Sequence, residues 1–183
     1  MDAWKTLLRA DPTEWLLEEE NPSVRYFALR DLFDKPEDDP EVIEAKSEIM
    51  EKGAVPEILT KQREAEYLAA YPRFYTNKYR GLVWSLIALA ELGAEPVPQI
   101  REQCEYLLKH AQEALQGGFS QATSAKTGGG MASEVIPCLT GNMVWSLIRF
   151  GYVDDPRLWK GVDWLTAYMR LNDGVETEPQ IPP

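Results

Sequence analysis

Apolar residues recur at steps of three and four along most of the chain, which is the spacing of one face of an α-helix. Val83, Leu86 and Ala90 follow this spacing, and Val144 and Leu147 repeat it later. No stretch shows the strict alternation of apolar and polar residues that a half-buried β-strand requires. The pattern therefore predicts an all-α fold.

Capping residues and helix breakers divide this pattern into separate helices. Asn21-Pro22, Asp39-Pro40 and Asp155-Pro156 each place a capping side chain before a proline at the first helical position. Glycines 53, 93 and 151 are suited to end helices, since glycine takes the left-handed conformation readily. Helices are expected at about 3–9, 13–20, 22–33, 40–53, 55–68, 79–92, 97–114, 133–150 and 155–169.

One long interruption breaks the helical pattern. Residues 116–132 contain five glycines and no apolar periodicity. Loops of this length inside a helical domain are either functional or disordered. Small and polar residues dominate the segment, which favours a mobile loop.

An internal repeat is the clearest feature of the sequence. The five residues from Val83 to Ile87, Val-Trp-Ser-Leu-Ile, recur identically from Val144 to Ile148, at an offset of 61 positions. Each copy leads into a second helix and then a glycine turn, Gly117-Gly118 in one and Asp173-Gly174 in the other. A helical hairpin cannot bury its apolar face alone, so the hairpins are expected to stack.

The second helix of each unit carries a recognisable motif, Glu102-Gln103-x-x-Tyr106-Leu107 in one and Lys160-Gly161-x-x-Trp164-Leu165 in the other. These segments resemble the start of the QW motif of the α/α toroid superfamily, which includes squalene-hopene cyclases and protein prenyltransferase β subunits. The chain also resembles prokaryotic prenyltransferase-like proteins of unnamed reaction. The resemblance implies stacked antiparallel helical hairpins forming part of an α/α toroid. Complete toroids carry more hairpins than this chain, and an open ring exposes apolar faces that favour a homo-oligomer.

The charge is concentrated in the first third of the chain. Of a net charge of -11 over 183 residues, residues 1–66 supply -9, with eighteen acidic and nine basic residues. We expect one domain over 1–175, with acidic, diverged helices at 1–70, two clear hairpin repeats at 75–175, and a polar, proline-rich tail at 176–183. The acidic part is interpreted as a solvated face, and a contact surface for a basic partner is the alternative.

Composition excludes several classes of protein. The acidic balance argues against nucleic-acid binding, which requires cations on the phosphates. The apolar runs are far shorter than the roughly 20 residues of a membrane span, and the first residues lack the apolar centre of a signal peptide. Two cysteines, Cys104 and Cys138, suit a reducing, cytoplasmic location rather than a disulfide framework.

The catalytic motifs of the resembling families are incomplete here. The acidic DxDD motif of the cyclases does not occur, and the pairs at 38–39 and 154–155 fit helix caps. Prenyltransferases bind zinc through Asp, Cys and His, and this chain offers Cys138, Glu134 and, upstream, His110. Three such ligands would converge only by coincidence, so no metal and no cofactor are predicted. Glu134 and Cys138 remain the candidate catalytic residues.

Aromatic and polar residues near the repeats are candidates for ligand binding. Trp84 and Trp145 hold equivalent repeat positions, and Tyr79, Arg80 and Asn142 lie close to them in sequence. In toroid enzymes such aromatic residues line an apolar cavity and stabilise cations through their π faces, and a cation near a helix start suits a diphosphate. Equally, residues that recur in each repeat pack helix against helix.

Two functions follow, and the sequence does not decide whether the chain is an enzyme. The first is a prenyltransferase- or terpene-cyclase-like domain whose concave face binds an isoprenoid or other apolar small molecule. The second is a non-catalytic, HEAT-like repeat module that binds a protein, because Asn21-Pro22-Ser23-Val24-Arg25 resembles the start of a HEAT-type repeat. A deep pocket lined by the tryptophans and tyrosines with a carboxylate at its floor would favour the first.

Overall fold

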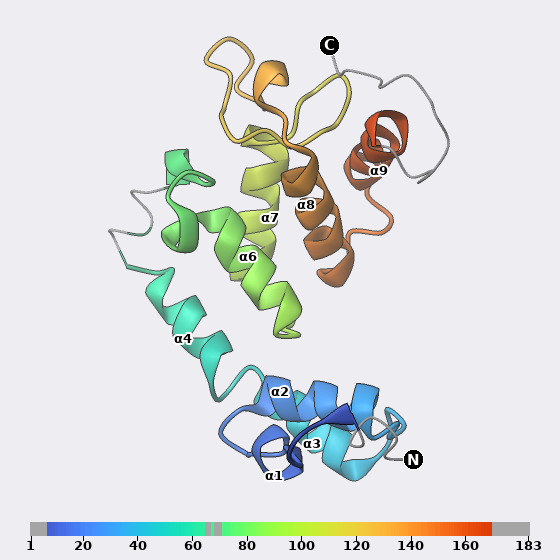
Figure 1. Cartoon of the computed structure of the whole chain (residues 1–183). Coiled ribbons are helices and arrows are strands. Elements are labelled where there is room, and N and C mark those ends of the chain that lie inside the picture. The colour runs from blue at the N-terminus through green and yellow to red at the C-terminus, as the bar shows by residue number, and fades with distance from the viewer. Residues whose placement is uncertain (1–6, 65–66, 68–70, 170–183) are drawn as a thin grey trace. The chain divides into compact units, whose positions relative to one another are not determined.

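A computed structural model describes residues 7–64, 67 and 71–169 of the chain (Figure 1). Every regular element of these residues is helical, which confirms the all-α prediction. The predicted tail at 176–183, the turn at Asp173-Gly174 and most of the predicted helix at 3–9 lie outside the described residues. The helices are α1 (Thr13–Leu16), α2 (Pro22–Phe27), η2 (Ala28–Leu32), α3 (Pro40–Glu48), α4 (Ala54–Lys61), η3 (Tyr71–Arg73), η4 (Lys78–Arg80), α6 (Leu82–Glu91), α7 (Pro98–His110), η5 (Ala132–Glu134), α8 (Pro137–Arg149) and α9 (Pro156–Tyr168).

The chain divides into two compact units. Unit 1 comprises residues 1–63 and 91–95, and unit 2 comprises residues 64–90 and 96–183. Unit 1 therefore contains most of the acidic first third, and unit 2 contains nearly all of both hairpin repeats.

Unit 1 is built around a short helical hairpin. Helix α2 continues without a break into η2, a π-helical turn, and α3 packs against it. Leu29, Val42 and Ala45 are buried between these elements. Asp39 caps α3 as the sequence predicts, accepting a hydrogen bond from the backbone N–H of Glu41 at 2.9 Å.

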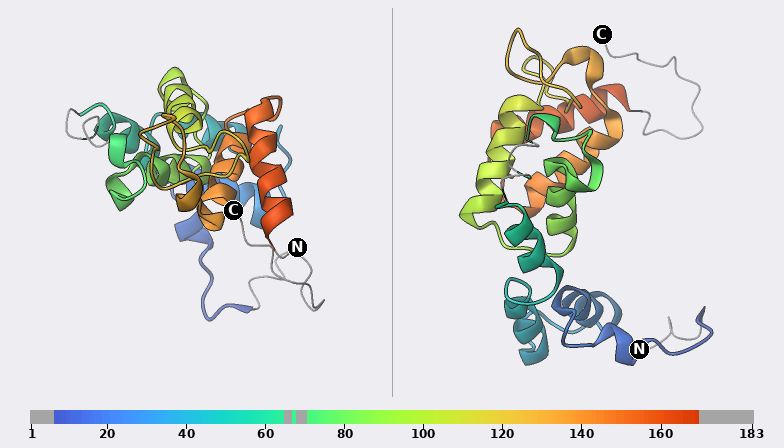
Figure 2. Two further views of the ribbon diagram at one scale, coloured as in Figure 1. Left: turned by 90° about the horizontal axis from the view of Figure 1, so that it is seen from above. Right: turned by 90° about the vertical axis from the view of Figure 1, so that its left-hand side faces the viewer.

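The core of unit 2 lies between α6, α7 and α8, with α9 packed against α8 (Figures 1 and 2). Gly161 of α9 faces α8, and a Cβ atom added there would lie 2.9 Å from Cγ2 of Val144. The glycine thus lets the two helices approach closely. The fully buried side chains of this core include Phe74, Leu82, Leu86, Ile100, Leu107, Phe119, Leu139, Met143 and Phe150.

The two Val-Trp-Ser-Leu-Ile copies present matching faces. In both α6 and α8 the valine, serine and leucine are buried, while the tryptophan and isoleucine are more exposed. Burial thus follows the repeat position by position, as expected for two copies of one structural unit. The buried residues are Val83, Ser85 and Leu86 in α6 and Val144, Ser146 and Leu147 in α8.

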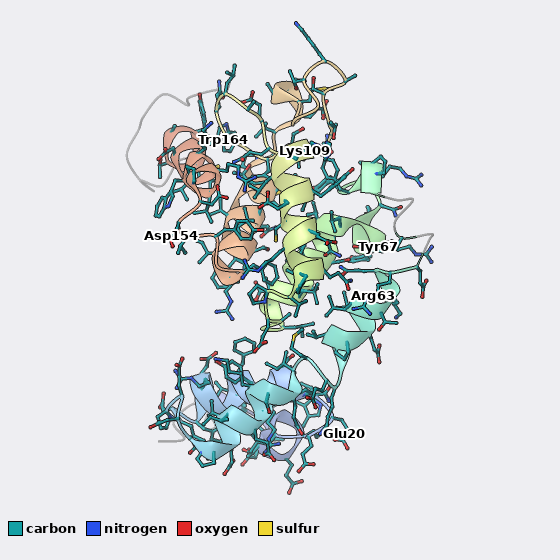
Figure 3. All side chains as sticks on the ribbon, turned by 180° about the vertical axis from the view of Figure 1, so that it is seen from behind. Glu20, Arg63, Tyr67, Lys109, Asp154 and Trp164 are labelled. Carbon is teal, nitrogen blue, oxygen red and sulfur yellow. The ribbon has the colours of Figure 1, made fainter. Side chains whose placement is uncertain are left out.

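The glycine-rich segment at 116–132 differs from the mobile loop that its composition favours. Its backbone pairs with the flanking chain, because Ser120 N–H donates to Ala111 at 2.8 Å and Gly130 N–H donates to Gln112 at 2.8 Å. Phe119 is completely buried. Gly118 lies against Trp164 of α9, labelled in Figure 3, at a distance that only glycine allows. Composition did not reveal these anchors, since one buried aromatic ring outweighs many polar neighbours.

The acidic pair at 154–155 has the structural role that the sequence predicts. Asp155 caps α9 by accepting from Arg157 N–H at 2.8 Å, and its carboxylate also binds the Arg157 guanidinium. The same guanidinium forms two hydrogen bonds to Glu105 of α7, at 2.8 and 2.9 Å. These bonds lower the pKa of both carboxyl groups below their usual values and tie the start of α9 to α7.

Two glycine-to-alanine substitutions are expected to change stability in opposite directions. A Cβ atom at residue 118 would lie 2.5 Å from Cγ1 of Val135 and 2.9 Å from the Trp164 ring, so Gly118→Ala should destabilise by about 1–3 kcal/mol. Gly141→Ala, within α8, meets no atom within 4 Å and should stabilise by up to about 1 kcal/mol. Urea denaturation followed by circular dichroism measures both changes, and equal stability of the two variants would contradict the packing described.

Candidate functional site

One face of α8 carries a row of exposed side chains, which we call the α8 stripe: Cys138, Asn142, Trp145, Ile148 and Arg149. Successive members are three or four residues apart, apart from the adjacent last pair, so they share one side of the helix. The opposite side of α8 is buried in the core. Three of the residues singled out from the sequence, Cys138, Asn142 and Trp145, are thereby brought onto a single surface.

Trp145 is the centre of the α8 stripe. Its side chain is 42% exposed, and Ile148 beside it is 41% exposed. The guanidinium carbon of Arg149 lies 5.5 Å from the centroid of the Trp145 ring, within the range of a cation–π contact. The stripe thus combines an apolar surface with a positive charge held over an aromatic face.

Gly141 has no side chain to shield the backbone of α8 beside this stripe. A Cβ atom at this position would have no neighbour within 4 Å. Glycine inside a helix costs about 1 kcal/mol relative to alanine, and no neighbouring side chain requires it here. A bare backbone does, however, allow a binding partner to approach closely.

Trp84 holds the equivalent position on α6 and is half-buried. Its indole N–H donates to the backbone oxygen of Tyr75 at 3.1 Å, and the Tyr75 ring stacks on it with centroids 5.8 Å apart. The ring of Tyr79, which is 88% exposed, lies beside the same indole, with the two ring centroids 6.3 Å apart. At the repeat offset of 61, the positions of these tyrosines are held by Ile136 and Thr140. The segment before Trp145 thus has no tyrosine at either of these two positions.

The two candidate catalytic residues are not assembled into a reactive pair. Glu134, in η5, accepts a hydrogen bond from the side-chain amide of Gln121. Cys138 is exposed in the first turn of α8. Within the described residues, no hydrogen bond joins Cys138 to a basic side chain or to Glu134. Arg80 is exposed at the end of η4, next to Tyr79.

The interior of unit 2 is closely packed where its helices meet. The cavity between α6, α7 and α8 has a volume of about 10 Å³. Its lining contains no tryptophan, tyrosine or carboxylate: Leu86, Cys104, Leu107, Phe119, Met143, Ser146 and Leu147. This cavity is too small for more than about one water molecule.

The residues considered as zinc ligands have separate partners. The Nδ1 atom of His110 lies 3.1 Å from the backbone oxygen of Gly128, and its ring contacts Tyr106. Over residues 7–64, 67 and 71–169, no three His, Cys, Asp or Glu side chains gather closely enough to hold a metal ion.

Sequence reasoning missed three members of the site: Gly141, Ile148 and Arg149. The signal that identifies them is their spacing from Trp145, at four residues before, three after and four after. The glycine was a further signal, because it interrupts an otherwise strong helical run.

Comparison with protein-family models, curated proteins and solved structures finds no match to this chain. Among the described helices, none has the length and apolar character needed to cross a membrane.

The two cysteines are expected to differ sharply in reactivity. Burial raises the pKa of the Cys104 thiol to about 12, so it stays protonated near pH 8, whereas Cys138 is exposed. A chromogenic disulfide reagent at pH 8 should therefore react quickly with one thiol per chain and with two after unfolding. Cys138→Ser should abolish the fast reaction and Cys104→Ala should preserve it. Two fast thiols in the native protein would contradict this assignment.

Proposed function

We propose that the chain is a non-catalytic helical-repeat module that binds another protein through the α8 stripe. The observation that carries this proposal is the 42% exposure of Trp145 at a repeat position whose counterpart, Trp84, is half-buried and stacks on Tyr75. Tryptophan and arginine are the residues that most often dominate the energy of protein interfaces.

The arrangement of polar groups supports binding over catalysis. A nucleophilic cysteine requires an activating base, and Glu134 is instead engaged by Gln121. The cavity between α6, α7 and α8 is too small for a substrate, which further supports a surface site, since small-molecule reactions usually take place in a concave pocket.

The matching faces of α6 and α8 support a fold-level proposal. Unit 2 is a stack of hairpins that resembles part of an α/α toroid, as in the prenyltransferase-like family that the sequence resembles. A second copy of the chain is among the protein partners proposed for the α8 stripe. The exposed thiol of Cys138 supports a reducing, cytoplasmic location.

A second candidate function is the binding of an isoprenoid diphosphate. It is favoured by the cluster of Tyr75, Tyr79 and Trp84, which lies beside the cations Lys78 and Arg80. Aromatic faces suit an apolar chain, and the two cations suit a diphosphate group.

Photo-crosslinking tests the protein-binding function. A benzoylphenylalanine at position 145 should give a discrete adduct in cells that express the chain, because a partner covers this face. The same residue at position 159, where Trp159 is 52% exposed on α9, is the matched control and should give none. Gly141→Ala should lower the yield of adduct while raising the thermal stability. Equal adducts from positions 145 and 159 would contradict the proposal, and the mass of the adduct distinguishes a second copy from another protein.

Thermal shift measurements separate the two functions. Farnesyl and geranylgeranyl diphosphate, each with and without zinc and magnesium, should leave the Tm of an interaction module unchanged. A ligand at about one hundred times its Kd would stabilise by ~2.7 kcal/mol, which is readily measured. A rise in Tm that Tyr79→Ala removes and Leu115→Ala preserves would instead establish the second candidate, since both side chains are 88% exposed and neither supports the core.

A further inference from the structure

Unit 1 contains an open apolar groove of about 390 Å³. Leu16 of α1, Val24 and Phe27 of α2, and Leu92 just after α6 supply its apolar walls. Asp31 and Glu91 are its two acidic lining residues, and both are exposed. A volume of this size lies within the range of roughly 300–1,000 Å³ that is typical of binding sites.

The main wall of the groove is one face of a continuous helix. Val24, Phe27 and Asp31 lie at positions i, i+3 and i+7 of the α2–η2 segment. The π-helical turn of η2 falls within this wall, and such turns are frequent at functional sites. A helix face with this spacing accepts the matching face of another helix.

Phe27 is held in place from behind the groove. Gly93, with φ of +76°, lets the chain pass so close that an added Cβ atom would lie 3.3 Å from Cζ of Phe27. The Tyr26 ring meets Phe27 edge to face at 5.0 Å. The apolar floor is therefore formed before any partner arrives, which reduces the entropic cost of binding.

The groove lies in a strongly acidic unit. Unit 1, with its 91–95 segment, carries eighteen acidic and nine basic residues in the sequence. In the part of the chain that the structure describes, none of the ion pairs involves Asp31. Four of the basic residues of unit 1 pair with other acids: Arg25 with Glu44, Arg30 with Glu37, Lys35 with Asp39 and Glu41, and Lys52 with Glu48.

We infer that this groove docks a cationic amphipathic helix of another protein. The apolar face of such a helix fills the floor, and its lysine or arginine side chains reach Asp31 and Glu91 while their aliphatic stems cover Val24. A second copy fits this groove less well than a basic helix, because a chain of net charge -11 offers little positive charge to Asp31 and Glu91. Residues 170–183 do not fit either, since they carry one basic and three acidic residues. Anionic lipids and nucleic acids are excluded by the same sign of charge.

A designed peptide of known chemistry tests the inference on the full chain. The probe is a fluorescein-labelled leucine–lysine helix of about 18 residues, roughly 27 Å long. Fluorescence anisotropy should show saturable binding with a Kd on the order of 10 μM. A counterpart with glutamate in place of every lysine should not bind.

Two pairs of matched variants locate the binding to the groove. Val24→Asp should weaken binding by about tenfold or more, because it places an unpaired charge on the apolar floor. Ile43→Asp changes an exposed aliphatic residue of α3 outside the groove and should have little effect. Asp31→Asn should weaken binding by about threefold, whereas Asp38→Asn, with the same loss of charge outside the groove, should not. Circular dichroism verifies that each variant is folded.

Several outcomes would overturn the inference. No saturable binding of the lysine peptide below about 100 μM would overturn it, as would equal binding of the glutamate peptide. An equal effect of Asp31→Asn and Asp38→Asn would show diffuse attraction to the acidic surface instead of docking. A dimer in sedimentation velocity that Val24→Asp disrupts and Ile43→Asp preserves would assign the groove to a second copy.

Discussion

The burial of Phe119 is the constraint on which the arrangement of unit 2 depends. This residue lies in a glycine-rich segment, yet its side chain is completely buried in the core between α6, α7 and α8. Its backbone is fixed at the same time, because its N–H donates to Oγ1 of Thr140 at 2.9 Å and its carbonyl oxygen accepts from Ile136 N–H at 3.0 Å. Replacing such a ring with alanine typically costs about 3–5 kcal/mol. The ring therefore sets where α8 begins, and the start of α8 sets which of its residues face solvent.

The position at which α8 begins also bears on why the tryptophans of the two Val-Trp-Ser-Leu-Ile copies differ in exposure. Val, Ser and Leu of each copy are committed to the core, so the tryptophan must point away from it in both helices. The segment before α6 supplies Tyr75, which stacks on the Trp84 ring, and Tyr79 beside it. The segment before α8 instead holds the glycine-rich loop, because Ile136 N–H donates to Phe119, and Thr140 within α8 is buried and accepts from Phe119 N–H. The exposure of Trp145 is thus a consequence of the loop being anchored, and the α8 stripe exists because the first repeat and the second are preceded by different segments.

Much of the fold was predictable from the sequence, because helix boundaries depend on local chemistry. Asp39 and Asp155 cap their helices as proposed, and Gly93 and Gly151 adopt positive φ angles after α6 and α8. Two local predictions were wrong: the Asn21 side chain forms no capping hydrogen bond to α2, and α3 ends at Glu48, so Gly53 instead precedes α4. Contacts between segments distant in the sequence were harder to predict. The anchoring of the loop depends on Gly118 meeting Trp164 and Gly130 meeting Ala111, which no local pattern reveals. The candidate site was predicted in part, since the repeat identified Trp145 but not the exposure that distinguishes it from Trp84. The groove of unit 1 was missed because the spacing of Val24, Phe27 and Asp31 is that of an ordinary amphipathic helix. Only the structure shows which part of this apolar face the other described residues leave open.

The two exposed apolar surfaces differ in the sign of the charge beside them, and this difference decides what each can select. The α8 stripe holds Arg149 over an aromatic ring. The partner surface that binds there with the most favourable free energy is therefore apolar, with a neutral or acidic rim. The groove of unit 1 is bordered by Asp31 and Glu91 within a strongly acidic unit, so it favours a basic rim. The hydrophobic effect has no direction and gives little specificity, so apolar contact alone would let one partner bind at either surface. The opposite charges beside the two surfaces oppose binding at the wrong one. A partner whose charges complement one surface would bring like charges together at the other. On the two proposals made above, the concentration of acidic residues in unit 1 would keep the partner of the groove apart from the partner of the α8 stripe.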